Sequence, residues 1–361
     1  MENQEKYIER CIELAKNGLG TTYPNPMVGS VIVYQDKVIG EGWHQKSGEP
    51  HAEVNAINSV QDKSLLKKAT IYVSLEPCSH FGKTPPCCDL IIANAIPNVV
   101  IGTIDSNIKV AGNGIKKLIE AGINVTVGVL ESECKELNKR FFTFHEKKRP
   151  YVILKWAESQ DGFIAPILRP FDKLKASLAR DEKTKRKPVW ITNEFSRQLV
   201  HKWRSEEQAI LVGTNTVVDD NPKLDVRDWT GNNPIRIVLD QNDRISKDSH
   251  IYDNHIKTII FSQMPNAIIG ENITFEAIDF KQNLAQQILK ELHKHNIQSV
   301  IIEGGQLTLQ TFIDEDLWDE ARIFIGNNAF ENGTKAPSIA LERSEKHSIG
   351  NDELVISRNY D

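Results

Sequence analysis

The stretch Thr70-Ile-Tyr-Val-Ser-Leu-Glu-Pro-Cys78 joins a run of β-branched and apolar residues to a proline and a cysteine. Such a run is typical of a buried strand, so we expect Cys78 just beyond a strand end. Upstream, His51-Ala-Glu53 falls at the start of an expected helix, and downstream Pro85-Pro86 predicts a helix that begins near Cys87. These side chains are therefore expected where strand ends and helix starts converge, which is where ligands gather in α/β sheets.

One imidazole and two thiolates form the ligand set of a catalytic zinc site, because they leave the fourth tetrahedral position open to water. We predict one Zn²⁺ per chain, with His51, Cys78 and Cys87 as its ligands. Glu53 is the expected catalytic residue, because zinc deaminases place a proton-carrying glutamate two residues after the histidine. The common pattern of those enzymes continues as P-C-x-x-C, whereas here Cys87 follows Cys78 by nine positions.

A closed structural zinc site is the competing interpretation of the same residues. It would need a fourth protein ligand, for which Cys88 and His80 are the candidates. Cys87 and Cys88 are neighbours on the expected helix, where adjacent side chains diverge, so the two do not easily reach one metal ion. Glu53 beside an open zinc position also argues against a zinc-stabilised interaction module without activity.

The length and composition limit which classes of protein this chain can belong to. A chain of 361 residues is long enough for two domains. With 40% hydrophobic residues, 26% charged residues and a net charge of −5, it is typical of globular proteins and gives no electrostatic reason to expect nucleic acid. The sequence has no secretory signal and no apolar stretch long enough to span a bilayer. Its 5 cysteines, of which Cys11 and Cys134 are expected in the core, indicate a reducing compartment. We therefore expect a cytoplasmic enzyme with a small-molecule substrate, no nucleic-acid or membrane partner, and self-association as an open alternative.

Strand and helix patterns alternate in two series, which favours helices packed on a sheet in each half of the chain. The first series has expected helices at 7–19, 51–57, 86–95, 113–121 and 131–144, and strands at 28–34, 38–43, 70–75, 99–104 and 125–129. The charged stretch 145–150 then predicts a domain boundary. The second series has strands at 151–156, 209–212, 235–239, 258–261, 299–302, 321–325 and 354–357, and helices at 193–204, 284–295 and after Gly305.

The segment Glu76-Pro-Cys-Ser-His-Phe-Gly-Lys-Thr-Pro-Pro-Cys87 resembles the bifunctional riboflavin-biosynthesis deaminase/reductase family, in which the longer loop between the cysteines is characteristic. Pro24-Asn-Pro-Met-Val-Gly29, Asp220-Asn-Pro222 and Glu303-Gly-Gly305 match the same family. The resemblance covers nearly the whole chain. It implies a cytidine-deaminase-like α/β/α sandwich as the deaminase domain over residues 1–146, and a dihydrofolate-reductase-like α/β domain as the reductase domain over residues 150–361.

Two activities are implied by this resemblance. The first is the zinc-dependent hydrolytic deamination of 2,5-diamino-6-(5-phosphoribosylamino)pyrimidin-4(3H)-one, and the second is the NADPH-dependent reduction of its ribosyl group to a ribityl chain. The positions that match substrate contacts of the deaminase half are Asn25, His44, His80 and Lys83. Lys83, in the loop between the cysteines, is the residue expected to meet the phosphate.

For the reductase half, the residues alone say little. Paired glycines between a strand and a helix form a place where backbone N–H groups can meet a phosphate, but a full G-x-G-x-x-G fingerprint is missing. The resemblance implies NADPH contacts at Ala157, Trp190, Thr216, Asp220 and the run from Gly305, and substrate contacts at Arg204, Leu224, Arg227 and Glu303. Arg204 and Arg227 suit phosphate, because the guanidinium fork pairs bidentately with phosphate oxygens.

The chain departs from the family at Pro188, where a substrate-contacting serine is common. Proline offers neither a hydroxyl nor a backbone N–H group. The preceding stretch 167–187 is rich in Lys and Arg, and it is either a solvated loop or the source of a cation, within 173–187, that replaces the lost contact.

The alternative function for the whole chain is a zinc nucleobase deaminase with an inactive or differently specific second domain.

Overall fold

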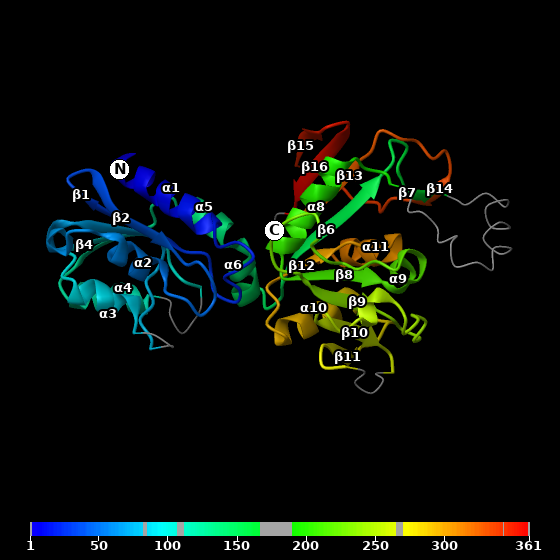
Figure 1. Cartoon of the computed structure of the whole chain (residues 1–361), viewed down its shortest axis with the longest axis horizontal. Helices are drawn as coiled ribbons and strands as arrows, with labels where there is room; N and C mark the ends of the chain where they lie inside the picture. The colour runs from blue at the N-terminus through cyan, green and yellow to red at the C-terminus, as the bar shows by residue number, and fades with distance from the viewer. Residues whose placement is uncertain are drawn as a thin grey trace. The chain divides into compact units, whose positions relative to one another are not determined.

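The computed structural model describes residues 2–81, 85–106, 112–166, 190–264, 270–341 and 343–359. It divides the chain into two compact units, Met1–Arg149 and Pro150–Asp361 (Figure 1). Within the described ranges, no helix combines the length and the apolar character that crossing a membrane requires.

The first unit is built on a sheet with the strand order β2-β1-β3-β4-β5 in the described residues. β1 pairs antiparallel with β2 and β3, whereas β3, β4 and β5 run parallel, so the carboxyl ends of β3 and β4 lie at one edge. The elements are α1 (Glu2–Lys16), β1 (Gly29–Tyr34), β2 (Lys37–Trp43), α2 (Ala52–Ser59), η1 (Lys63–Lys68), β3 (Thr70–Leu75), α3 (Cys87–Ala93), β4 (Asn98–Thr103), α4 (Asn113–Glu120), β5 (Asn124–Val127), α5 (Glu131–Leu137) and α6 (Lys139–Glu146).

Helices cover both faces of this sheet. Alternate residues of a strand point to opposite faces, and β1 shows the consequence: Ile32 packs with residues of α2 and α3, whereas Val31 and Val33 pack with residues of α1 and α5. Figure 1 shows α1 and α5 on one side of the sheet and α3 and α4 on the other. The predicted α/β/α sandwich is confirmed.

The second unit has a larger sheet, with the order β11-β10-β9-β8-β12-β6-β13-β16-β15 in the described residues, and a short pair β14-β7. From β11 to β13 the strands run parallel, and β16 and β15 add antiparallel pairs at one edge. The elements are β6 (Tyr151–Glu158), β7 (Phe163–Pro166), α8 (Glu194–Glu206), β8 (Ala209–Gly213), α9 (Thr214–Asp220), β9 (Ile235–Leu239), η2 (His250–Tyr252), β10 (Thr258–Ser262), β11 (Ile273–Ala277), α10 (Leu284–Lys294), β12 (Ser299–Ile302), α11 (Gln306–Asp314), β13 (Glu320–Ile325), β14 (Gly333–Lys335), β15 (Ser344–Ile349) and β16 (Asp352–Arg358). The predicted α/β class is confirmed here as well.

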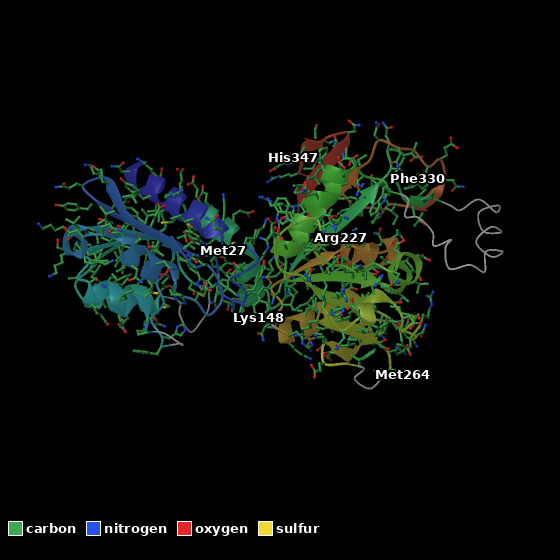
Figure 2. The ribbon with its side chains drawn as sticks, viewed as in Figure 1. Met27, Lys148, Arg227, Met264, Phe330 and His347 are labelled. Carbon is green, nitrogen blue, oxygen red and sulfur yellow. The ribbon has the colours of Figure 1, made fainter. Side chains whose placement is uncertain are left out.

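One predicted helix is divided in two. The sequence pattern predicts a single helix over 131–144, whereas α5 ends at Leu137 and α6 begins at Lys139. The cause is Asn138, whose buried amide accepts from the Met27 N–H group at 2.8 Å and donates to the Met27 carbonyl at 2.8 Å. Met27 is labelled in Figure 2. These two bonds tie the break between the helices to the loop that carries Asn25.

Candidate functional sites

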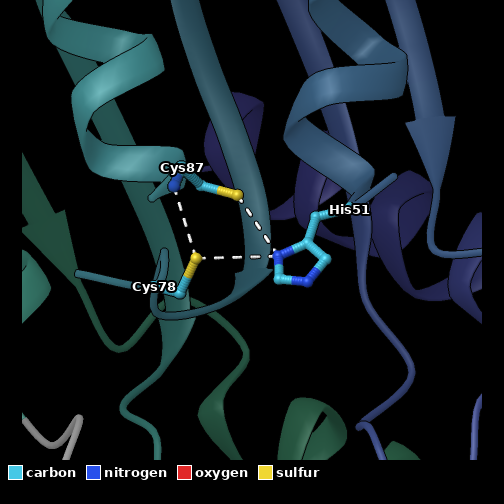
Figure 3. Close-up of side chains that lie close together, drawn as sticks. All are labelled: His51, Cys78 and Cys87. Atoms are coloured by element: carbon cyan, nitrogen blue, oxygen red, sulfur yellow. Dashed lines mark hydrogen bonds between the residues drawn. The ribbon is translucent and has the colours of Figure 1, made fainter. Parts of the chain in front are cut away.

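Three side chains meet beyond the carboxyl end of β3. His51 is the N-cap residue of α2, Cys87 is the first residue of α3, and Cys78 lies in the loop after β3. His51 Nδ1 is 3.6 Å from Cys78 Sγ and 3.4 Å from Cys87 Sγ (Figure 3). The ligand atoms of all three residues lie within 4.8 Å of one another. The side chains predicted to hold zinc are thus brought together.

The spacing of these atoms fits a zinc ion. Zinc binds a histidine nitrogen at about 2.0–2.1 Å and a cysteine sulfur at about 2.3 Å, so tetrahedral coordination places nitrogen and sulfur about 3.6 Å apart. The two nitrogen–sulfur distances, 3.6 and 3.4 Å, agree with that value. Donors of this kind suit zinc, and a set of three protein ligands leaves one tetrahedral position open.

The local structure shifts the pKa values of the two thiols in opposite directions. The backbone N–H group of Cys87, at the start of α3, donates to Cys78 Sγ at 3.3 Å, and a helix N-terminus favours negative charge. The pKa of the Cys78 thiol is lowered to about 4 by hydrogen bonds from the Cys87 thiol and from His51, while burial opposes the shift. The same pairing with Cys78, together with burial, raises the pKa of Cys87.

Glu53 lies in the first turn of α2 and is buried. Its carboxyl group lies close enough to the Cys87 thiol for the two groups to interact. Burial raises the pKa of Glu53 to about 6, and the nearby Cys78 adds to the shift. A carboxyl group in this position, with a pKa near neutrality, is suited to taking up and releasing a proton.

Two of the four predicted substrate contacts of this half lie beside the metal ligands. The His44 ring lies 5.3 Å from the His51 ring, centroid to centroid. His44 Nδ1 is 3.2 Å from the Pro50 carbonyl oxygen, which can only accept, so Nδ1 carries the proton. Nε2 is then the acceptor, and Asn25 Nδ2 donates to it at 3.1 Å. Burial lowers the pKa of His44, which favours this neutral ring. This bond fixes the orientation of the Asn25 side-chain amide, with Oδ1 as its acceptor atom.

The remaining candidates of this half do not join the cluster. His80 is exposed, and Lys83 lies outside the described residues. Cys88, the competing fourth ligand, turns its Sγ toward the carbonyl oxygens of Pro77 and Gly114, at 3.3 and 3.6 Å. The carboxyl group of Glu76, which was not predicted to have a role, accepts hydrogen bonds from backbone N–H groups near the start of α4.

In the second unit, a charged cluster lies just beyond the carboxyl end of β12, beside the middle of β6. Glu303 follows β12, and its carboxylate pairs with Arg204 of α8 through Nε at 3.2 Å and Nη2 at 2.7 Å. Arg204 Nη1 also donates to the Asp225 carbonyl at 3.2 Å. Lys155 of β6 lies close enough to interact electrostatically with Glu303 and Arg204, and burial lowers its pKa. Lys155 was not predicted to be a site residue, although a lysine within the otherwise apolar strand 151–156 could have indicated it.

Beside this cluster, glycines and threonines lie close together where β8 leads into α9 and β12 leads into α11, and we call this group the cradle. A Cβ atom added to Gly213 would lie 2.7 Å from Thr308 Oγ1, and one added to Gly304 would lie 3.0 Å from Thr216 Oγ1. Gly305, the N-cap residue of α11, has a positive φ of 64° that favours glycine. Backbone N–H groups and hydroxyl groups here suit phosphate oxygens, so the residues present fit a dinucleotide. Asp220 is exposed one turn after Thr216, on the same side of α9.

The other predicted residues of this half occupy different environments. Trp190 is 55% exposed, and the Arg197 guanidinium lies 4.6 Å from its ring centroid. Leu224 is buried, and Ala157 is half-buried on β6. Arg227, labelled in Figure 2, is exposed and pairs with Asp225 at 3.0 Å. Pro188 and the basic stretch 167–187 lie outside the described residues.

Comparisons with known proteins match both units. Residues 1–103 match the family model described as the cytidine and deoxycytidylate deaminase zinc-binding region. Residues 150–330 match the model described as the RibD C-terminal domain. The metal ligands lie inside the first range, and the charged cluster and the cradle lie inside the second.

Similar proteins and structures extend over nearly the whole chain. The riboflavin biosynthesis protein RibD of Aquifex aeolicus is 36% identical over 99% of this chain and 99% of its own length. A structure from Thermotoga maritima, described as a diaminohydroxyphosphoribosylaminopyrimidine deaminase/5-amino-6-(5-phosphoribosylamino)uracil reductase, is 37% identical, with a TM-score of 0.84 over 99% of both chains. RibD of Acinetobacter baumannii is 29% identical with a TM-score of 0.84, covering 100% of this chain and 99% of that one. At these identities, sustained through both units, the chain belongs to the RibD family of riboflavin biosynthesis proteins.

Proposed function

We propose that this chain carries out two consecutive steps of riboflavin biosynthesis. The first is the hydrolytic deamination of 2,5-diamino-6-(5-phosphoribosylamino)pyrimidin-4(3H)-one, and the second is the reduction of the ribosyl group of the product to a ribityl chain by NADPH. We assign deamination to residues 1–146 and reduction to residues 150–361. The observation that carries the proposal is the meeting of His51, Cys78 and Cys87, with Glu53 against Cys87, in a chain whose second half matches the RibD C-terminal domain.

In the first unit, His51, Cys78 and Cys87 would hold zinc, which when bound supplies a water activated at neutral pH. Glu53 then takes a proton from that water and delivers it to the departing ammonia. Asn25 presents its side-chain oxygen, whose orientation is fixed through His44 and Pro50, to an amino group of the pyrimidine. Because an oxygen acceptor is offered at this point, the substrate must carry a hydrogen-bond donor there.

In the second unit, the cradle formed by Gly213, Gly304, Gly305, Thr216 and Thr308 would hold the phosphates of NADPH, which when bound supplies a hydride. Glu303 and Lys155 would contact the sugar, and the bidentate pair with Arg204 keeps the Glu303 carboxylate ionised and fixed. Three of the five N–H groups of Arg204 are engaged by Glu303 and Asp225, which leaves two for a substrate phosphate. Arg227 is exposed and supplies the second cation.

The environment of the protein follows from the same chemistry. A reducing compartment keeps thiol ligands from forming disulfides, and the 5 cysteines are free. We therefore propose a cytoplasmic enzyme that acts on a phosphorylated small molecule. A zinc nucleobase deaminase with an inactive second domain is not favoured, because the relatives that match both units carry the RibD name along their whole length.

Replacing the proton carrier tests the deamination step. Glu53→Gln keeps the shape of the side chain but cannot exchange a proton, so we expect ammonia release from the diaminopyrimidine substrate to fall by at least about 10²-fold. Zinc content, measured by atomic absorption, should stay at one per chain, and NADPH oxidation with the deaminated substrate should be unchanged. Ammonia release at the rate of the unmodified protein would contradict the assignment of Glu53.

A further inference from the structure

Glu76 is a buried acid that lies two residues before Cys78 and is 4% exposed. Its two carboxylate oxygens accept hydrogen bonds from backbone N–H groups of one downstream segment. Oε2 accepts from Asp105 at 3.3 Å and from Gly112 at 3.0 Å. Oε1 accepts from Gly114 at 2.9 Å and from Ile115 at 3.3 Å. One side chain therefore binds the start of α4 to the end of β3.

The start of α4 depends on this distant oxygen. The first N–H groups of any helix have no partner within the helix and are usually satisfied by the side chain of the N-cap residue. Here the N-cap residue is Gly112, which has no side chain and a φ of 75°. Gly114 and Ile115 belong to the first turn of α4, and Glu76 supplies the acceptor for both. An ionised carboxylate also suits the positive end of the helix.

The first turn of α4 also packs against the peptide group that joins Pro77 to Cys78. A Cβ atom added to Gly114 would lie 2.2 Å from the Pro77 carbonyl oxygen, so the backbone of α4 touches that carbonyl. Cys88 Sγ donates to the Pro77 carbonyl at 3.3 Å, and the Cys88 N–H group donates to the Cys78 carbonyl at 3.2 Å. The backbone that carries the Cys78 thiol is thus in contact with both α4, through Gly114, and α3, through Cys88.

We propose that Glu76 is a positioning residue of the metal centre, which fixes α4 beneath Pro77 and so sets where Cys78 Sγ lies relative to His51 and Cys87. The proposal rests on the proposed deaminase function of that centre. Groups outside the ligand shell that orient ligands commonly change metal affinity by about 10–100-fold when they are replaced. Without the carboxylate, the N–H groups of Gly112, Gly114 and Ile115 lose their acceptor. The first turn of α4, which contacts the Pro77 carbonyl, is then expected to shift.

The charge and both oxygens of Glu76 are required by this geometry. Glu76→Gln leaves one acceptor oxygen and turns an NH₂ group toward N–H donors, so part of the set loses its partner. Glu76→Asp keeps both oxygens and the charge on a side chain shorter by one methylene. Zinc affinity should therefore follow the order unmodified, Glu76→Asp, Glu76→Gln.

The experiment measures the metal site of the full-length chain in two ways. Competition with a chromophoric zinc chelator gives the zinc affinity, and the visible spectrum of the Co²⁺-substituted protein reports ligand geometry. Glu76→Gln is expected to weaken zinc binding by about 10–100-fold and to change the Co²⁺ spectrum. Asp62→Asn is the control for removing a capping charge from the same unit, because the exposed Asp62 caps η1 by accepting from Ser64 N–H at 3.0 Å. It should leave both readouts unchanged.

The outcomes separate a positioning role from a general loss of stability. A zinc affinity and Co²⁺ spectrum of Glu76→Gln equal to those of the unmodified protein would overturn the proposal, as would equal effects of Glu76→Gln and Asp62→Asn. If Glu76→Gln does not fold, Glu76→Asp provides the test, since its affinity must fall below that of the unmodified chain by at least several-fold. An unmodified protein that binds no zinc would instead refute the proposed function.

Discussion

At the scale of single residues, the two adjacent cysteines of α3 illustrate how the fold separates a ligand from its neighbour. Cys87 Sγ faces His51 at 3.4 Å, whereas Cys88 Sγ faces the Pro77 carbonyl at 3.3 Å. Successive positions of a helix differ in direction by about 100°. The structure therefore agrees with a metal site of three protein ligands, in which Cys88 supports the backbone that carries Cys78.

Exchange of each cysteine for serine tests this difference. A serine hydroxyl does not ionise near neutral pH and is a poor zinc ligand, so Cys78→Ser should remove zinc from the purified protein. Cys88→Ser keeps a donor for the Pro77 carbonyl and should retain about one zinc per chain. Metal content by atomic absorption distinguishes the two variants. Full zinc content in Cys78→Ser would refute its assignment as a ligand.

Glu303 shows how a buried charge is maintained in the second unit. Burial alone would raise its pKa, but the charges of Arg204 and Lys155 and the hydrogen bonds from Arg204 lower the pKa to about 2. The ordinary pKa of a glutamate side chain is 4.5. A carboxyl group whose pKa is lower in the folded state stabilises the fold above the unfolded pKa, and this contribution is lost as the pH falls toward the folded pKa.

The consequence is an acid-dependent loss of stability that originates at Glu303. Between pH 6 and pH 3, its contribution to the free energy of unfolding should decrease by about 2 kcal/mol. Urea unfolding of the unmodified chain and of Glu303→Gln, followed across this range, isolates the contribution as the difference between the two curves. A difference that stays constant from pH 6 to pH 3 would contradict the lowered pKa.

Residues whose role follows from a local pattern could be predicted, and those whose role depends on distant backbone could not. His51, Glu53, Cys78 and Cys87 carry a spacing that zinc chemistry requires. Glu76 accepts from N–H groups up to 39 positions downstream, and backbone donors leave no trace in a sequence. Lys155, by contrast, interrupts an apolar strand and could have been singled out.

At the scale of elements, prediction worked best where a strand is buried on both faces and therefore has a continuous apolar sequence. β3, β4, β8 and β12 are almost entirely buried, and each lies close to its expected range. β15 was not predicted, because its sequence SEKHSI is polar and it lies exposed at the edge of the larger sheet. The division between α5 and α6 was missed because it depends on the contact of Asn138 with Met27, 111 positions away.

The cradle at the starts of α9 and α11 gives a prediction for NADPH binding. Gly213→Ala places a methyl group 2.7 Å from Thr308 Oγ1, where the proposed phosphate site lies. The Michaelis constant for NADPH should rise about tenfold, a change of about 1.4 kcal/mol in binding free energy. Steady-state kinetics with the deaminated substrate measure the change, and ammonia release should not be affected.

Gly270→Ala is a suitable control for this variant. Its added methyl group would also meet one side-chain oxygen at 2.7 Å, Asn254 Oδ1, in the same unit but outside the cradle. The Michaelis constant for NADPH should be that of the unmodified chain. Equal constants for Gly213→Ala and Gly270→Ala would show that the cradle does not hold the nucleotide.

At the scale of the whole molecule, each of the two units contains its own site and its own hydrophobic core. The metal centre is built from elements of Met1–Arg149, and the charged cluster and cradle are built from elements of Pro150–Asp361. Separate cores predict that a substitution in one site changes only one of the two activities. The product of the first reaction is the substrate of the second, so one chain accounts for both steps.

The most direct test supplies the zinc-loaded, full-length protein with the undeaminated diaminopyrimidine substrate and NADPH, and follows ammonia release and NADPH absorbance together. We expect NADPH to be consumed after a lag, with one ammonia released for each NADPH oxidised at completion. Glu53→Gln should release ammonia at least about 10²-fold more slowly, and it should oxidise NADPH at the normal rate only when the deaminated substrate is added. Ammonia release without any NADPH consumption, by protein that also fails to oxidise NADPH with the deaminated substrate, would contradict the claim that one chain performs both reactions.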